Sequence, residues 1–95
     1  MFFYNSGTQE TDIEVLTSTN SIHYTNQNTR GPHGPDYPST SKQAPLPRDA
    51  STAWHEYRLD WMPGKTAFYI DGVLKAEHTQ NVASRPGPWL WNNWR

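Results

Sequence analysis

The chain has 95 residues, enough for one small domain, and a formal net charge of −1 that offers no basic surface for nucleic acid. It contains no cysteine, which excludes a disulfide framework and a thiolate metal site, and no apolar run approaches the ~18 residues of a membrane span. Only 34% of the residues are hydrophobic, so the five tryptophans and the other aromatic side chains must supply much of any core.

Two strands are predicted in the first third of the chain. In residues 10–16 acidic positions alternate with apolar or β-branched ones, which is typical of a strand with two unlike faces. Residues 21–26 are rich in β-branched and aromatic side chains and form the second strand. If the two strands pair as a hairpin, His23 lies beside the acidic positions, where it either tunes a carboxylate pKa or has a structural role.

A long loop is predicted over residues 27–53. This stretch contains five prolines and two glycines. Proline fixes φ and lacks a backbone donor, so this density excludes a helix or a central strand. Leu46, between two prolines, could dock on a sheet edge.

Three strands are predicted in the middle of the chain, at residues 57–61, 66–70 and 73–77, from their apolar alternation. The last two flank Asp71-Gly72. This dipeptide favours a two-residue hairpin turn, because both central residues of such a turn need a positive φ.

A final strand is predicted at residues 89–94, after a Pro-Gly-Pro break. No stretch shows helical periodicity, and there is no internal repeat. The sequence therefore predicts an all-β, antiparallel fold of about six strands. Four aromatic side chains are expected in its core: Trp54, Tyr57, Trp61 and Phe68.

Three acidic residues, Glu10, Asp12 and Glu14, carry the main chemistry of the sequence. Because side chains alternate along a strand, all three carboxyl groups project from one face. Like charges at this spacing repel one another and raise at least one pKa. Glycoside hydrolysis requires such a pair, with one carboxyl ionised and one protonated. Alternatively, the three acids form the solvated face of an edge strand, where charge discourages edge-to-edge pairing.

Four blocks of the sequence resemble glycoside hydrolase family 16, which includes laminarinases, lichenases, xyloglucan-modifying enzymes and fungal cell-wall transglycosylases. The blocks are residues 9–16, 22–27, 54–61 and 68–72. Their order and spacing match over nearly the whole chain, most closely in the fungal members. The resemblance implies a concanavalin-like β-jelly roll with a sugar-binding cleft. It also implies a retaining glycosidase acting on O-glycosyl bonds of β-glucan-type cell-wall polysaccharide, by hydrolysis or transglycosylation.

The resemblance also implies roles for individual residues. Glu10 is expected to be the nucleophile, Asp12 the carboxylate that orients it, and Glu14 the general acid and later the base. The spacing of the three is the regular, unbulged form of the family. Four residues are expected to face the substrate, although the first two could equally be ordinary strand and turn residues: Tyr24, Asn26, Asn92 and Trp94. Trp89 and Trp91 are expected to pack inward.

Catalytic domains of this family are considerably longer, so residues 1–95 are expected to be a partial catalytic domain, an incomplete jelly roll from a longer protein. The expected partner is a polysaccharide or oligosaccharide substrate. No cofactor is expected, and the scattered histidines lack the spacing of a zinc site. The full-length family acts outside the cell or in the cell wall, and no signal peptide is recognised in this chain.

Two non-catalytic alternatives remain open. In the first, the chain is a truncated jelly-roll remnant that binds carbohydrate while Glu10 and Glu14 lie too far apart to act. In the second, it is a generic β-sandwich interaction domain, which leaves the acidic strand unexplained. The oligomeric state, the linkage specificity and the choice between hydrolysis and transglycosylation also stay open.

Overall fold

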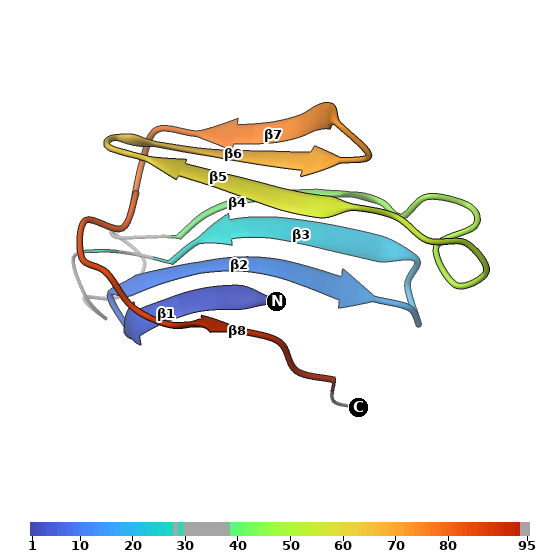
Figure 1. The fold of residues 1–95 in the computed structure, drawn as a ribbon, viewed down its shortest axis with the longest axis horizontal. Coiled ribbons are helices and arrows are strands. Elements are labelled where there is room, and N and C mark those ends of the chain that lie inside the picture. Colours follow the sequence, from blue (N-terminus) through green and yellow to red (C-terminus); the bar gives the residue numbers. More distant parts are fainter. Residues whose placement is uncertain (28, 30–38, 94–95) are drawn as a thin grey trace.

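The computed structural model describes residues 1–27, 29 and 39–93, which form two stacked antiparallel β-sheets (Figure 1). The strands are β1 (Phe2–Ser6), β2 (Gln9–Leu16), β3 (Ser21–Asn26), β4 (Thr40–Pro45), β5 (Tyr57–Met62), β6 (Lys65–Ile70), β7 (Val73–His78) and β8 (Trp89–Leu90). One sheet has the order β4-β3-β2-β1-β8 and the other β5-β6-β7. The all-β, antiparallel prediction is confirmed. Within this described part, no helix is long and apolar enough to cross a membrane.

The core lies between the two sheets and is built from buried side chains of β2, β3, β6 and β7. It comprises Ile13, Ile22 and Tyr24 from the five-stranded sheet and Phe68, Ile70 and Ala76 from the three-stranded sheet. The rings of Tyr24 and Phe68 meet with centroids 5.2 Å apart. Full burial of one such side chain stabilises the fold by about 1.5–3 kcal/mol. This packing holds β2 and β3 in place. It therefore also positions the side chains on the opposite face of the same sheet.

Both predicted hairpins are present. Strands β2 and β3 pair in register from Thr11 opposite Asn26 to Leu16 opposite Ser21. In the second hairpin, Asp71 and Gly72 have φ angles of 51° and 79°, the positive values that the Asp-Gly turn requires.

The predicted loop over residues 27–53 is interrupted by a strand. Residues 40–45 form β4, which pairs with β3 along its whole length. Its only proline, Pro45, is its last residue, so no proline interrupts the preceding ladder. Because β4 is an edge strand, it is consistent with the prediction that this stretch contains no central strand. Leu46 follows it, donates its backbone N–H to the carbonyl of Asn20 at 2.8 Å and packs against the core.

Residues 86–88 lead the chain back to the five-stranded sheet, where they run close beside β1. Tyr4 donates its backbone N–H to the carbonyl of Pro88, and the side-chain amide of Asn5 donates to the carbonyl of Pro86. A side chain at Gly87 would meet the carbonyl oxygen of Tyr4 at 2.6 Å, so only glycine fits this close approach. The strand β8 follows and pairs with β1, although it ends at Leu90 rather than at the predicted residue 94.

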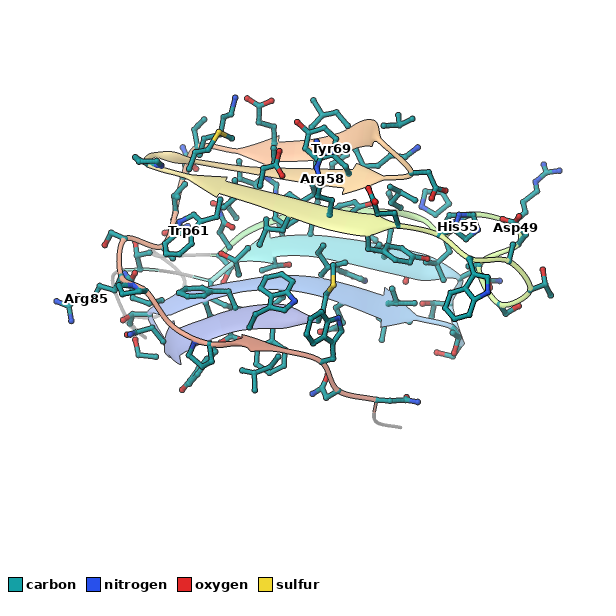
Figure 2. All side chains as sticks on the ribbon, in the orientation of Figure 1. Asp49, His55, Arg58, Trp61, Tyr69 and Arg85 are labelled. Atoms are coloured by element: carbon teal, nitrogen blue, oxygen red, sulfur yellow. The ribbon has the colours of Figure 1, made fainter. Side chains whose placement is uncertain are left out.

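Two of the four aromatic residues that were predicted to lie in the core lie outside it. Phe68 is fully buried and Tyr57 packs partly against the core. Trp54 is fully exposed, because it lies in the loop before β5, outside the alternating strand pattern. Trp61 is 41% exposed at the end of the sandwich opposite His55, where its ring contacts Phe3 at 4.7 Å and its indole N–H donates to the carbonyl of Ala83 (Figure 2).

Candidate active site

Strand β2 displays its three carboxyl groups on the face that points away from the second sheet. Thr11 and Ile13, which alternate with them, are buried between the layers at 1% and 3% exposure. Glu10 and Asp12 are half-buried and Glu14 is exposed. The sequence prediction that the acids share one face of a regular strand is therefore confirmed.

Glu10 and Asp12 form a closely interacting pair. Burial of Glu10, a hydrogen bond with Asp12 and the charge of Asp12 together raise the pKa of Glu10 to about 7. This shift agrees with the expectation that like charges at this spacing raise at least one pKa. The division into an ionised Glu10 and a protonated Glu14 stays a prediction.

Strand β3 supplies the neighbours on one side of the acids. Thr25 lies opposite Asp12, and His23 lies opposite Glu14, as the predicted hairpin requires. The first residue after β3, Gln27, donates its side-chain N–H to Asp12 Oδ2 at 2.9 Å. Its amide oxygen accepts a hydrogen bond from the Ser39 hydroxyl at 2.9 Å.

Sequence reasoning missed Gln27, because it assigned this residue to the loop. The strand parity already present in the sequence could have found it. Positions 23, 25 and 27 alternate with the buried ones, so Gln27 falls on the acidic side of the sheet.

Strand β1 supplies the neighbours on the other side, which the sequence prediction also missed. Tyr4 lies opposite Glu10, and Phe2 lies opposite Asp12. Leu90 of β8 pairs with Phe2 in turn. Tyr4 is 40% exposed and Leu90 38%, so the acids are bordered by an accessible aromatic and apolar surface. Such a surface suits the C–H-rich faces of sugar rings, against which flat aromatic side chains pack.

A pocket of 610 Å³ opens over the acidic strand. Its lining includes all three acids, Gln27 and part of the C-terminal segment, namely Glu10, Asp12, Glu14, Gln27, Trp91, Asn92 and Asn93. The structure thus brings Asn92 together with the acids, whereas Trp94 lies outside the described residues. Trp91 is 72% exposed and lines the pocket, so the expectation that it packs inward is wrong.

Tyr24 and Asn26, by contrast, lie between the sheets and do not reach the pocket. They are 1% and 0% exposed. The amide N–H groups of Asn26 donate to the Thr66 hydroxyl at 2.9 Å and to the carbonyl of Gln80 at 3.0 Å, and its oxygen accepts from the Thr11 hydroxyl at 3.2 Å. Asn26 is therefore a polar link between the two layers, which fits the structural alternative considered for it.

No metal site accompanies these residues in the described part of the chain. There, no group of three or more histidine or acidic side chains is arranged to hold an ion.

Comparison with known proteins places this arrangement in context. The model of the family "Glycosyl hydrolases family 16" matches residues 1–89. A beta-glucanase of Paenibacillus polymyxa is 41% identical over 90 residues, covering 93% of this chain and 36% of that protein. A beta-glucanase of Bacillus subtilis is 35% identical, covering 90% of this chain and 33% of that protein. The chain thus spans about a third of the length of these relatives.

A solved structure matches the fold. The beta-glucanase of Bacillus licheniformis superimposes with a TM-score of 0.72 at 28% identity, covering 90% of this chain and 40% of that one. This confirms the expected jelly-roll architecture as a partial domain. The reported relatives come from Paenibacillus and Bacillus, so they lend no support to the expected likeness to fungal members.

Proposed function

The chain belongs to glycosyl hydrolase family 16, and from this premise we propose that it carries the catalytic strand of a retaining glycosidase. The proposed substrate is a β-glucan-type cell-wall polysaccharide, since the relatives are named beta-glucanases. Reaction at such a polysaccharide implies that the protein acts outside the cell or in the cell wall.

The observation that carries the proposal is the open acidic face of β2. Its three carboxyl groups line one pocket, and burial and the neighbouring Asp12 raise the pKa of Glu10 to about 7. Retaining glycosidases need an ionisable nucleophile and a separate proton donor on either side of the scissile bond. A purely solvated edge strand would explain neither the central position of β2 in its sheet nor the raised pKa of Glu10.

In the proposed reaction, ionised Glu10 attacks the anomeric carbon while Glu14 gives its proton to the departing glycosidic oxygen. The C–O bond of the glycoside breaks and a covalent ester to Glu10 forms. Glu14, now ionised, then takes a proton from water or from a sugar hydroxyl, whose oxygen attacks the same carbon and frees Glu10. Asp12 holds Glu10 in position throughout.

The proposed binding surface consists of the pocket residues around these acids. Asn92 offers an amide for sugar hydroxyl groups, and Tyr4 and Phe2 offer the adjoining aromatic surface. Trp94 is kept as a proposed contact on the resemblance alone. Tyr24 and Asn26 are not part of the proposed surface, because both are buried between the sheets.

A second candidate function is carbohydrate binding without turnover. It is favoured by the accessible aromatic and apolar surface beside the acids, where Tyr4 is 40% exposed and Leu90 38%. In this alternative the acids and this surface contact glucan, but no glycosidic bond is broken.

The test is to measure turnover of lichenan, laminarin and chitin oligomers by the full chain, Glu10→Gln and a control, Glu77→Gln, on the other sheet. We expect turnover by the wild type and the control only. A 2-fluoroglycoside with a good leaving group should add its sugar mass to the peptide that contains Glu10. Glucan binding without turnover in the wild type would select the second candidate, and equal turnover in Glu10→Gln would overturn the nucleophile assignment.

A further inference from the structure

Gln9 is the first residue of β2, and its side chain binds a segment that lies far along the chain. Its amide oxygen accepts the backbone N–H of Ser84 at 2.6 Å and that of Arg85 at 3.1 Å. Because a backbone N–H can only donate, these two bonds require the oxygen of the amide, and not its NH₂ group, to face the segment. The strand that carries the acids is therefore bound directly to residues 84–85.

The segment that Gln9 binds connects the two sheets. Residues 79–88, here called the crossover segment, lead from β7 to β8 and contain no strand (Figure 1). Their backbone groups therefore need partners other than a strand ladder. Trp61 on β5 and the β1 residues Tyr4 and Asn5 donate hydrogen bonds to carbonyl groups of the segment. Gln9 complements them, because it accepts from two N–H groups of the same segment.

The crossover segment leads to one side of the pocket. Trp91, Asn92 and Asn93, here called the pocket wall, line the pocket together with the acids. They follow β8, which has two residues and pairs with β1 at the edge of the sheet. A strand of two residues holds the chain less firmly than one of the usual length of about 5–6 residues. The position of the pocket wall therefore depends on what holds the crossover segment.

We propose that Gln9 is a positioning residue for substrate binding: by holding residues 84–85 at the start of β2, it keeps the pocket wall beside the acids. In the sheet, β1 lies between β2 and β8. The two bonds to Gln9 provide a direct connection between the acidic strand and the segment that carries the wall. The consequence for substrate rests on the proposed function, whereas the two bonds do not.

The contacts that this role would secure are those of a long substrate. Trp91 is 72% exposed and offers its ring to the C–H-rich face of a sugar, and Asn92 offers an amide to sugar hydroxyl groups. A glucan chain that spans the pocket meets both the acids and the pocket wall, whereas a small aryl glycoside reaches the acids without needing the wall. Displacement of the wall should therefore weaken the binding of long substrates selectively.

A neutral acceptor suits position 9. A carboxylate there would accept the same two N–H groups in stronger, charge-assisted bonds. It would also place a further negative charge next to Glu10, whose pKa is already raised by burial and by Asp12. Gln9→Glu is therefore a variant that keeps the bonds to the crossover segment and changes the charge beside Glu10.

The first measurement needs no substrate. Gln9→Met keeps the length of the side chain and removes the acceptor. Hydrogen exchange of the Ser84 and Arg85 amides should become about 5- to 10-fold faster, because each loses one hydrogen bond, and the amide NMR signals of Asn92 should shift. Gln9→Glu should keep the slow exchange. Gln43→Met, on the exposed edge strand β4, is the matched control and should change none of these signals.

The second measurement uses lichenan and a small aryl glucoside. Gln9→Met should raise KM for lichenan about tenfold, or Kd where the wild type binds without turnover, while kcat changes less than twofold. KM for the aryl glucoside should stay the same. Gln9→Glu should restore KM for lichenan. If Gln9→Met does not fold, Gln9→Asn takes its place, because it keeps the amide on a side chain one methylene shorter.

Faster exchange at Ser84 and Arg85 with an unchanged affinity for lichenan would show that Gln9 holds the crossover segment alone, and this result overturns the inference. A loss of affinity that Gln9→Glu does not reverse overturns it as well. If the wild type binds lichenan without turnover, the catalytic proposal fails, and the Kd of Gln9→Met decides the inference. A wild type that neither binds lichenan nor turns it over overturns both.

Discussion

Two regions of this molecule crowd acidic side chains together, with opposite results. On β2, burial and the neighbouring Asp12 raise the pKa of Glu10 to about 7. In the loop before β5, Asp49 lies 2.8 Å from His55 (Figure 2). Asp71, in the β6–β7 turn, lies 2.6 Å from the other ring nitrogen of His55. There the hydrogen bond to His55 lowers the pKa of Asp71, and the bond to Asp71 raises the pKa of His55.

The difference lies in whether the acids meet a cation. Asp71 also accepts the backbone N–H of Glu56 at 2.8 Å, so both its oxygens are used in holding the loop to the turn. Its charge therefore serves to stabilise the fold. On β2, Glu10 instead lies beside another acid, and its raised pKa lets it hold and release a proton near neutral pH. Proton-transfer chemistry requires this second arrangement.

Removing the proposed proton donor from β2 should give the largest effect. Glu14→Gln should lower kcat for natural glucans about 10²- to 10⁴-fold, because the departing oxygen loses its proton donor. Turnover of an aryl glycoside with a good leaving group should fall much less, since that group leaves without a proton. Glu77→Gln is the control. Equal losses on both substrates would contradict the role of Glu14 as general acid.

Placing a cation beside the acids of β2 should make their surroundings resemble those of Asp49 and Asp71, which lie beside His55. Thr25 lies opposite Asp12, and Thr25→Lys would place an ammonium group beside the pair. We expect the pKa of Glu10 to fall by about one unit from its value near 7, as an opposite charge favours the ionised form. At pH 6 the ionised fraction of Glu10, and with it kcat/KM, should rise about fivefold.

The control for this change is Thr25→Gln, which is neutral and of comparable length. It loses the same hydroxyl bond to Ser41 as Thr25→Lys does. If both variants shift the Glu10 titration equally, charge is not the cause and the comparison between the two regions fails.

Neutralising Asp71 should affect stability and not chemistry. Because the pKa of His55 is raised in the folded chain, its ion pairs contribute fully below its ordinary value of 6.5 and are lost as pH rises through the raised pKa. Because the pKa of Asp71 is lowered, its contribution is present above 3.8 and lost as pH falls through the lowered pKa. Asp71→Asn should therefore lower the thermal midpoint by several degrees near pH 5.5.

This loss should diminish at high pH, where His55 is neutral in both proteins. Asp60→Asn is the matched control, because Asp60 pairs with Arg58 at 3.1 Å on an exposed face and such pairs contribute little. A loss in Asp71→Asn that does not depend on pH would show that the geometry of the turn matters rather than the ion pair.

The sequence predicted the regular parts of the fold because local patterns determine them. The hairpins around Asp71-Gly72 and between β2 and β3 follow from turn chemistry and alternation, and both were placed to within a residue or two. Strand β4 could not be seen in the same way. Its residues, Thr40–Pro45, are mostly polar and surrounded by prolines, and it becomes a strand only because β3 presents a free edge.

The sequence predicted the parts of the candidate site that follow from strand alternation and from family resemblance. Both place the three acids of β2 on one face. The contact of Gln27 with Asp12 is accompanied by a contact with Ser39, 12 residues further along the chain, and no local pattern specifies either. Tyr24 shows the limit of resemblance: alternation puts it opposite buried Ile13, and the structure places it in the core.

The smallest effect is expected for Tyr24→Phe, which tests whether Tyr24 lies in the core and not on the pocket side of the sheet. Tyr24 is 1% exposed, and its hydroxyl is buried without a hydrogen-bond partner among the described residues. An unpaired buried hydroxyl costs free energy, so Tyr24→Phe should leave the free energy of unfolding unchanged or raise it by about 1 kcal/mol. KM for glucan should not change, because the side chain faces Phe68 and not the pocket. Tyr4→Phe, on the acidic face, is the comparison, since Tyr4 is 40% exposed and lies opposite Glu10. A rise in KM for Tyr24→Phe with none for Tyr4→Phe would show that the substrate approaches from between the sheets, and the assignment of the pocket would be wrong.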